Sequence, residues 1–288
     1  MAEVCPLGRA HSGGRSLTVR EGSHSGARTQ DRDEMKTIAL QNINRRVVAQ
    51  ACVVSAIAFA IKLFYSTSSV DDLRWILAPT TFLVELITGE KFWFESHAGY
   101  MSADHSFLIA DSCSGVNFLI MAFLMLCFLK LRKALRTDVS WAFIPTVLLA
   151  AYASTIIANT VRITVAIRLH RMSPEMIWIN PEQLHRLEGI FIYFGFLLFL
   201  FTFAESLEDD GRDNIRRSLL RQSLIPLSIY WFTTLGIPIL NGAYRQGVSF
   251  WEHSAFVLLT PTILILPLVA IRALVRRRSS SRYRFNSL

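Results

Sequence analysis

The stretch IADSCSGVNFL, residues 109–119, marks the point where a polar, glycine-containing segment turns into a long apolar run. In a membrane protein, such a boundary falls at the surface of the bilayer, where a helix begins. We therefore expect Cys113 at a membrane surface, at a helix start. This is a poor place for a structural cysteine and a good place for a nucleophile.

The apolar run that follows Cys113 is one of several in the chain. Of the 288 residues, 52% are hydrophobic, and they occur in blocks of roughly twenty, the length that crosses a bilayer as a helix. The sequence therefore predicts an all-α, multi-pass integral membrane protein. The formal net charge of +8 does not indicate nucleic-acid binding, because the basic residues gather between the apolar blocks, as they do in cytoplasmic loops.

The chain divides by composition into three parts. Residues 1–34 are rich in Gly, Ser, Arg and His and are predicted to be a disordered tail or an over-extension upstream of the true start. Residues 35–275 form the predicted transmembrane domain, and residues 276–288 a basic cytoplasmic tail. Four scattered cysteines are too few for a disulfide framework, and only Cys113 lies at a boundary.

Basic residues beside the apolar blocks predict the direction of each crossing. Arg45 and Arg46 precede the first block and indicate a cytoplasmic N-terminus. The helix after Cys113 ends in a basic cluster, which places that end in the cytoplasm and Cys113 outside: Lys130, Arg132, Lys133 and Arg136. Residues 73–88 are then interfacial or re-entrant, and we predict a bundle of six full spans. Seven spans are the alternative if the N-terminus is outside.

Between residues 91 and 110 the pattern changes to an alternation of apolar and polar residues. Phe92 and Phe94 precede a turn at residues 97–100, and Phe107 and Ile109 follow it. Such alternation around a glycine-containing turn is typical of a β-hairpin. We expect a small extracytoplasmic hairpin that lies on the membrane before the helix of Cys113.

Three polar residues are expected to meet at the extracytoplasmic face, because consecutive antiparallel helices alternate in direction. Cys113 starts one helix, Arg162 lies near the end of the next, and His185 starts the third. A helix N-terminus and a guanidinium both favour a thiolate, and Arg162 needs an anion near the hydrocarbon, either that thiolate or an oxyanion. His185 can pass a proton to a leaving amine. Together these residues indicate a thiol active site.

Two asparagines fall beside this trio. Asn117 lies one turn after Cys113, and Asn159 lies one turn from Arg162 on the same side of its helix. Both amides can offer hydrogen bonds to the site. We therefore include them as supporting residues.

Further support is expected from the chain next to the cysteine and the histidine. The backbone N–H groups around Ser114 and Gly115 can form part of an oxyanion hole. Glu188, one turn after His185, can orient the imidazole ring. Each of these functions depends on the three helices meeting as predicted.

Each member of the trio also has an ordinary structural explanation. A lone cysteine is often a small core residue, an arginine at a span end an anchor that reaches the interface, and a histidine at a helix start a cap. Two other classes therefore stay open. One is a transporter or channel in which Arg162, Asn159 and Asn117 bind an anion, and the other is a non-catalytic membrane scaffold.

We predict no metal and no cofactor. His97, His105 and Asp111 do not have a standard metal-ligand spacing. His170 and His185 lie on opposite sides of a loop and do not form a facing helical pair for haem. The proposed thiol chemistry needs neither.

Three short motifs at span boundaries resemble a known family. They are Cys-Ser-Gly at 113–115, Asn-Thr-Val-Arg at 159–162 and His-Arg-Leu-Glu-Gly at 185–189. In this order they resemble the exosortase and archaeosortase family of integral-membrane cysteine transpeptidases, over residues 73–203. The form Ser-Cys-Ser-Gly-Val-Asn at 112–117 is closer to the exosortase K type than to the main branch, and the connection after Arg171 is longer than in that branch.

This resemblance implies an enzyme of the plasma (inner) membrane that processes exported proteins. Its substrates would carry a C-terminal sorting signal, made of a short motif, a transmembrane helix and a basic tail. By analogy, Cys113 is the nucleophile, Arg162 stabilises the thiolate or oxyanion, and His185 is the general acid or base. Cleavage outside the membrane would form a thioester and pass the acyl group to an acceptor or to water. The expected partners are such substrates and membrane lipids, with no nucleic acid.

Overall fold

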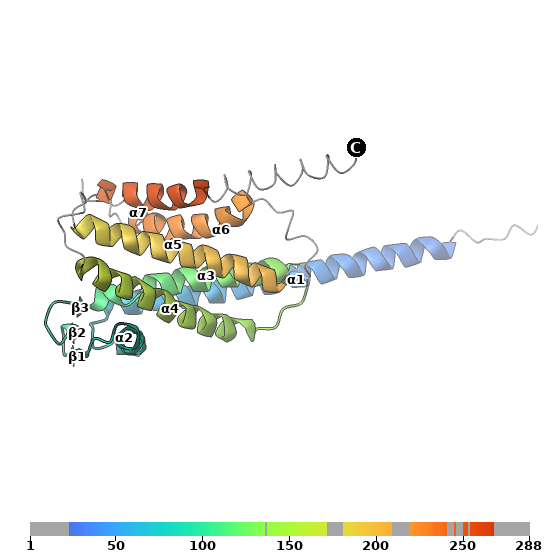
Figure 1. Cartoon of the computed structure of the whole chain (residues 1–288). Coiled ribbons are helices and arrows are strands. Elements are labelled where there is room, and N and C mark those ends of the chain that lie inside the picture. Colours follow the sequence, from blue (N-terminus) through green and yellow to red (C-terminus); the bar gives the residue numbers. More distant parts are fainter. Residues whose placement is uncertain are drawn as a thin grey trace, which may run out of the picture. The chain divides into compact units, whose positions relative to one another are not determined.

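The computed structural model describes residues 23–135, 137–171, 181–208, 219–240, 245, 250–252 and 254–267. These ranges are mainly helical (Figure 1). The chain divides into two compact units, Met1–Arg46 and Val47–Leu288. All of the candidate site residues belong to the second unit.

Within the described ranges, five helices are long and apolar enough to cross a membrane: Arg45–Thr67, Asp111–Ala134, Phe143–Arg171, Arg186–Leu207 and Phe250–Pro267. The apolar helical segment Ser223–Ile239 is shorter. A helix needs about 20 residues to span the hydrocarbon core. The chain therefore has the helices that the predicted multi-pass class requires.

The helix that follows the cysteine is the centre of the second unit. This helix, α3 (Val116–Ala134), packs against α4 (Phe143–Arg171), α5 (Pro181–Glu208) and α6 (Leu219–Trp231). Most of its side chains are buried, as expected for a helix that is apolar all round. Its position fixes Cys113, three residues before it, at one end of the bundle. We call this end, where α3 begins and α4 ends, the Cys113 end.

The short helix α2 (Arg74–Thr88) lies across the bundle. In Figure 1 it is seen end-on, whereas α3, α4 and α5 run across the view. It packs against α4, where the Tyr152 hydroxyl donates a hydrogen bond to the Trp75 carbonyl (2.7 Å). Its other side exposes Phe82 and Leu86. With 15 residues, α2 is shorter than the roughly 20 residues that a membrane span needs.

The chain before α2 is tied to the chain after it. The carboxylate of Asp71 accepts hydrogen bonds from Ser96 Oγ (3.0 Å) and from the His97 N–H (3.1 Å). The same carboxylate lies 3.2 Å from His97 Nδ1. The chain therefore returns, after α2, to the level at which α2 began.

The predicted hairpin is the first part of a three-stranded antiparallel sheet. Strands β1 (Phe92–Glu95) and β2 (Gly99–Ser102) form it, with Glu95 opposite Gly99. The predicted second arm, with Phe107 and Ile109, is instead two strands: β2 takes in Gly99 and Tyr100 of the predicted turn, and β3 (Leu108–Ile109) pairs with the other edge of β2. Gly99 has a φ of +126°, and a Cβ there would collide with the Ile109 carbonyl. The close approach of β3 thus requires glycine at this position.

The predicted disordered tail differs from the structure over its last residues. Helix α1 (Ser23–Thr67) already includes residues 23–34. Once the apolar part of a helix has formed, each further residue adds a hydrogen bond at little cost, and this segment contains good helix formers such as Ala, Arg, Gln and Glu. Residues 1–22 and the predicted basic tail 276–288 lie outside the described residues.

Candidate functional site

The predicted helix start is divided in the structure, because Cys113 lies in a 3-10 turn that comes just before α3. The 3-10 turn Asp111–Cys113 is closed by hydrogen bonds from the Cys113 N–H to the Ala110 carbonyl and from the Ser114 N–H to the Asp111 carbonyl, both 2.9 Å. Gly115, with a φ of +74°, then redirects the chain into α3. The physical reason for the difference is this left-handed residue, which interrupts helical geometry after the cysteine. Cys113 itself is 9% exposed.

The structure changes the expected role of the backbone around Ser114. Its N–H is already bonded to the Asp111 carbonyl and is not free to form an oxyanion hole in this conformation. The Ser114 side chain is fully buried, and its hydroxyl has no hydrogen-bond partner among the side chains that the structure describes. Gly115 instead allows close packing, because a Cβ there would lie 3.2 Å from both Asn159 Cγ and Thr155 Cγ2.

Asn159 joins α4 to the turn of the cysteine. Its side-chain Nδ2 donates a hydrogen bond to the Cys113 carbonyl (2.5 Å), and its Oδ1 accepts one from the Tyr193 hydroxyl (2.8 Å). The residue is completely buried. Since a buried carbonyl without a donor is costly, this amide stabilises the turn that carries the thiol.

Arg162 lies one turn after Asn159 on α4 and is held by α5. Its Nη1 donates a hydrogen bond to the Tyr193 hydroxyl (3.1 Å), and its guanidinium lies 5.2 Å from the centre of the Tyr193 ring. It interacts electrostatically with Cys113 and with Glu188. Gly189 makes room for it, because a Cβ at this position would lie 3.2 Å from Arg162 Nε. The cation is therefore held against Tyr193 and Gly189 of α5.

Tyr193 is the residue that sequence reasoning missed. Its hydroxyl bridges Arg162 and Asn159, and its ring stacks on Phe118 of α3 with 5.1 Å between centroids. In the sequence it stands in an aromatic, apolar run that resembles any membrane helix. One signal was available: residues 185, 189 and 193 follow each other at intervals of four, which places them on one face of α5.

The other predicted residues are placed as follows. His185 belongs to α5 near the Cys113 end, but its side chain lies outside the described residues. Glu188 is buried and lies near Arg162. Asn117 is exposed, and its Oδ1 accepts a hydrogen bond from Lys62 Nζ of α1 (2.9 Å). The structure thus brings together Cys113, Asn159 and Arg162, whereas the described contact of Asn117 is with α1.

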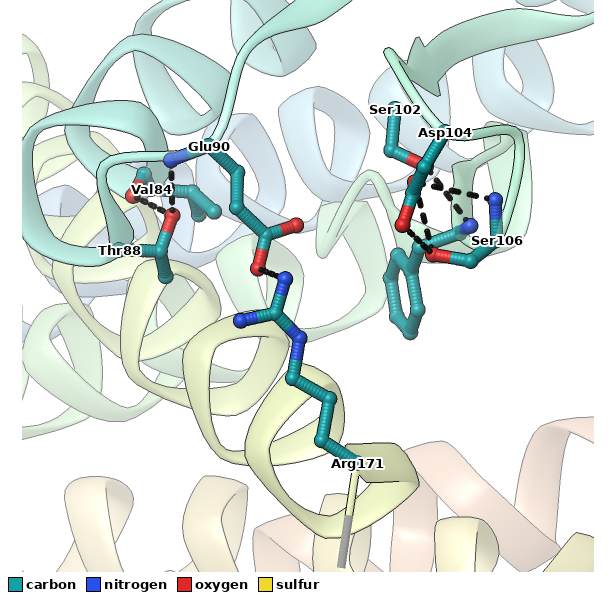
Figure 2. Close-up of polar contacts among 8 residues, drawn as sticks. Val84, Thr88, Glu90, Ser102, Asp104, Ser106 and Arg171 are labelled. Carbon is teal, nitrogen blue, oxygen red and sulfur yellow. Dashed lines mark hydrogen bonds and ion pairs between the residues drawn. The ribbon is translucent and has the colours of Figure 1, made fainter.

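Ion pairing also anchors the end of α4 near the site. Figure 2 shows Arg171, the last residue of α4, in contact with the carboxylate of Glu90, which follows α2. The Glu90 side chain is largely buried. The pair connects the segment before β1 to the same helix that carries Asn159 and Arg162. Among the described residues, no three His, Cys, Asp or Glu side chains gather as a metal site would require.

Comparison of the chain with protein-family models, with curated proteins and with solved structures found no match.

Proposed function

We propose that this protein is a membrane-embedded cysteine peptidase or transpeptidase of exosortase type. The observation that carries the proposal is the placement of Arg162. A guanidinium cannot lose its charge, and this one interacts with Cys113 as well as with Glu188, so it would stabilise a thiolate or an oxyanion formed there. The buried turn of the cysteine is held by Asn159, which lies one turn before Arg162 on the same helix.

The proposed reaction proceeds in two steps. The Cys113 thiolate attacks the carbonyl carbon of the scissile peptide bond, and Arg162 stabilises the oxyanion that forms. The C–N bond then breaks, His185 donates a proton to the leaving amine, and a thioester remains on Cys113. In the second step an acceptor amine or water attacks the thioester, gives up a proton to His185, and releases the thiolate.

The substrates that we propose are exported proteins with a C-terminal sorting signal of a short motif, a transmembrane helix and a basic tail. A helix in the bilayer would bring its outer end to the level of a site built at a bundle end. The basic tail would remain in the cytoplasm, in keeping with the distribution of positive charge. This is also why we place the protein in the plasma (inner) membrane, with the site on the extracytoplasmic face.

The proposed topology has six spans and does not count α2. The five long helices and Ser223–Ile239 then alternate in direction, so that α3 runs inward from Cys113. The contacts of Asp71 with Ser96 and His97 support this assignment, because they join the chain on both sides of α2. Lys133 and the other basic residues near the end of α3 would lie in the cytoplasm.

An anion transporter is less well supported. Transport requires polar groups that continue through the bundle, whereas the central helix is apolar from Phe118 to Leu129. The α5 residues Phe194, Leu197 and Phe201 are also completely buried and apolar. The polar groups around Arg162 therefore form a local site at one end.

The test of the proposal is replacement of the nucleophile in the native host. Cys113→Ala and Cys113→Ser should leave candidate exported proteins with a helix-plus-basic C-terminus at their full, unprocessed length, as seen by immunoblotting. Cys127→Ala is the matched control, because Cys127 lies buried in the same span. Unchanged processing in the Cys113 variants, at normal protein level, would remove the proposal.

A further inference from the structure

A continuous chain of hydrogen bonds runs from Arg162 to the backbone of the cysteine. Arg162 Nη1 donates to the Tyr193 hydroxyl (3.1 Å), which donates to Asn159 Oδ1 (2.8 Å), and Asn159 Nδ2 donates to the Cys113 carbonyl (2.5 Å). Every donor points in the same direction along this chain. Successive hydrogen bonds of this kind polarise and strengthen one another in a buried environment.

The hydroxyl of Tyr193 is the link that both neighbours need. Its proton is given to Asn159, so its oxygen lone pairs face Arg162. This arrangement fixes which side of the Asn159 amide carries the oxygen, and hence leaves Nδ2 for the Cys113 carbonyl. The tyrosine ring is itself held by stacking on Phe118 of the central helix.

We propose that Tyr193 is a positioning residue that sets the reactivity of the Cys113 thiol by aligning Arg162 and the turn of the cysteine. The role rests on the proposed function of Cys113 as nucleophile, although thiol reactivity is measured without a substrate. In the described part of the chain, the hydrogen bonds of the Tyr193 hydroxyl are to Arg162 and Asn159. It acts through two neighbours, the cation on one side and the amide on the other.

Other charged or titratable groups belong to or interact with the elements that carry this chain of hydrogen bonds and contribute to any dependence on pH. Glu188 interacts with Arg162, and Tyr65 of α1 interacts with Tyr193. Asp111 belongs to the turn of the cysteine, and His185 to the first part of α5. All of them remain in a Tyr193→Phe variant. A difference between this variant and the unaltered site therefore reports the hydroxyl alone.

The experiment uses the full chain in lipid nanodiscs with Cys113 as its only cysteine, through replacement of Cys5, Cys52 and Cys127 by alanine. The small thiol reagent methyl methanethiosulfonate is the probe, and mass spectrometry follows its addition across a range of pH. The rate at high pH reports access to the thiol. The position of the rate curve along the pH axis reports the effect of the cation.

Loss of the hydroxyl should move this curve to higher pH. For Tyr193→Phe we expect a rate at neutral pH about tenfold lower, the size of one hydrogen bond to a charged group, with an unchanged plateau at high pH. Tyr230→Phe is the matched control, because Tyr230 is also a buried tyrosine in the bundle and packs against Phe194. It should behave as the unaltered site.

A second variant tests the chain from its other side. Asn159→Ala should move the curve in the same direction, and the Asn159→Ala/Tyr193→Phe double variant should show less than the sum of the two effects, as residues of one network do. An unmoved curve in Tyr193→Phe, or fully additive effects, would overturn the proposal. If both single variants fail to fold while Tyr230→Phe folds, the chain serves folding rather than reactivity, and the proposal is again overturned.

The outcome is independent of the proposed peptidase activity. A shifted curve together with unchanged substrate processing in Cys113→Ala would support the positioning role and remove the enzyme function. An unmoved curve together with lost processing in Cys113→Ala would support the enzyme function and remove the positioning role of Tyr193.

Discussion

The backbone of Gly189 lies directly against the guanidinium of Arg162. A Cβ at this glycine would be 3.2 Å from Nε and 3.7 Å from Cζ. Only a residue without a side chain lets α5 approach α4 this closely at the level of the arginine. The face of α5 that contains residues 185, 189 and 193 thus accommodates the guanidinium of Arg162.

Gly189→Ala should displace Arg162. The added methyl group must push the guanidinium by a few tenths of an ångström from the position in which it bonds to Tyr193. A misplacement of about 1 Å costs up to about 100-fold in rate, so we expect a loss of processing between about threefold and 100-fold. Gly195→Ala is the control on the same helix, since nothing lies within 4 Å of a Cβ there.

The control variant should instead stabilise α5 slightly, by about 0.5–1 kcal/mol, because alanine favours a helix more than glycine does. Thermal unfolding in detergent and processing of the exported substrate measure the two effects. Equal activity of Gly189→Ala and Gly195→Ala would show that the space at Gly189 has no bearing on Arg162.

Gly115 and Gly89 form a second matched pair, because both have a left-handed backbone conformation with φ of +74° and +77°. Alanine costs about 1–2 kcal/mol in this conformation wherever it occurs. At Gly89 nothing lies within 4 Å of the new methyl group. At Gly115 it would crowd Asn159 and Thr155, which adds about 1–3 kcal/mol for overpacking.

We therefore expect Gly115→Ala to lower the free energy of unfolding clearly more than Gly89→Ala. Denaturant titration of both variants in mild detergent, followed by tryptophan fluorescence, gives the comparison. A Gly115→Ala variant as stable as Gly89→Ala would mean that α4 does not pack against the cysteine turn as described.

Asp104 provides a prediction about pH. Figure 2 shows its carboxylate among Ser102 and Ser106. Hydrogen bonds from the side chains of Ser102 and Ser106 and from the Ser106 N–H lower the pKa of Asp104 from 3.8 to about 2. A lowered pKa means that the ionised carboxylate stabilises the folded loop above pH 3.8. This contribution is lost as the pH falls from about 4 toward 2.

Pepsin cleavage after Phe107 measures the order of this loop in acid. At about pH 4.5 the unaltered protein should be cut more slowly than Asp104→Asn. Asparagine has one side-chain oxygen, so it cannot accept all of the hydrogen bonds that the two carboxylate oxygens accept. At about pH 2 the two rates should approach each other. A constant ratio across this range would contradict the role of the ionised carboxylate.

The helical part of the fold follows from simple features of the sequence. Apolar blocks of sufficient length indicate the long helices, and the proline and limited length of residues 73–88 separate α2 from them. The division of the predicted second arm into β2 and β3 was not predictable, because β3 has two residues and its pairing depends on the close approach of Gly99 to the Ile109 carbonyl. Local patterns do not record such long-range contacts.

The candidate site was predictable where polar residues stand out against an apolar background. Asn159 and Arg162 are of this kind, one turn apart on one helix. Tyr193 was not, because its aromatic ring conceals a polar hydroxyl within an apolar run. The backbone bond of Ser114 was also missed, since the 3-10 turn that uses its N–H is set by the left-handed Gly115.

The last prediction concerns the position of α2 relative to the membrane. Because Asp71 contacts Ser96 and His97, positions just before and after α2 should lie on one side of the membrane. We expect Thr67→Cys and Glu95→Cys, each in a chain without other cysteines, to react in intact spheroplasts with a maleimide that does not cross membranes. Both side chains are exposed. Lys133→Cys, at the other end of α3, should react only after the membrane is disrupted.

Labelling of Thr67→Cys and Glu95→Cys on opposite sides would make α2 a crossing helix and the span count odd. If Thr67→Cys and Glu95→Cys both react on the same side of the membrane as Lys133→Cys, the two ends of α3 lie on one side, and α3 does not span the membrane. If instead Lys133→Cys alone reacts in intact spheroplasts, α3 crosses in the reverse direction. Cys113 would then face the cytoplasm, where an enzyme for exported proteins would not meet its cleavage site.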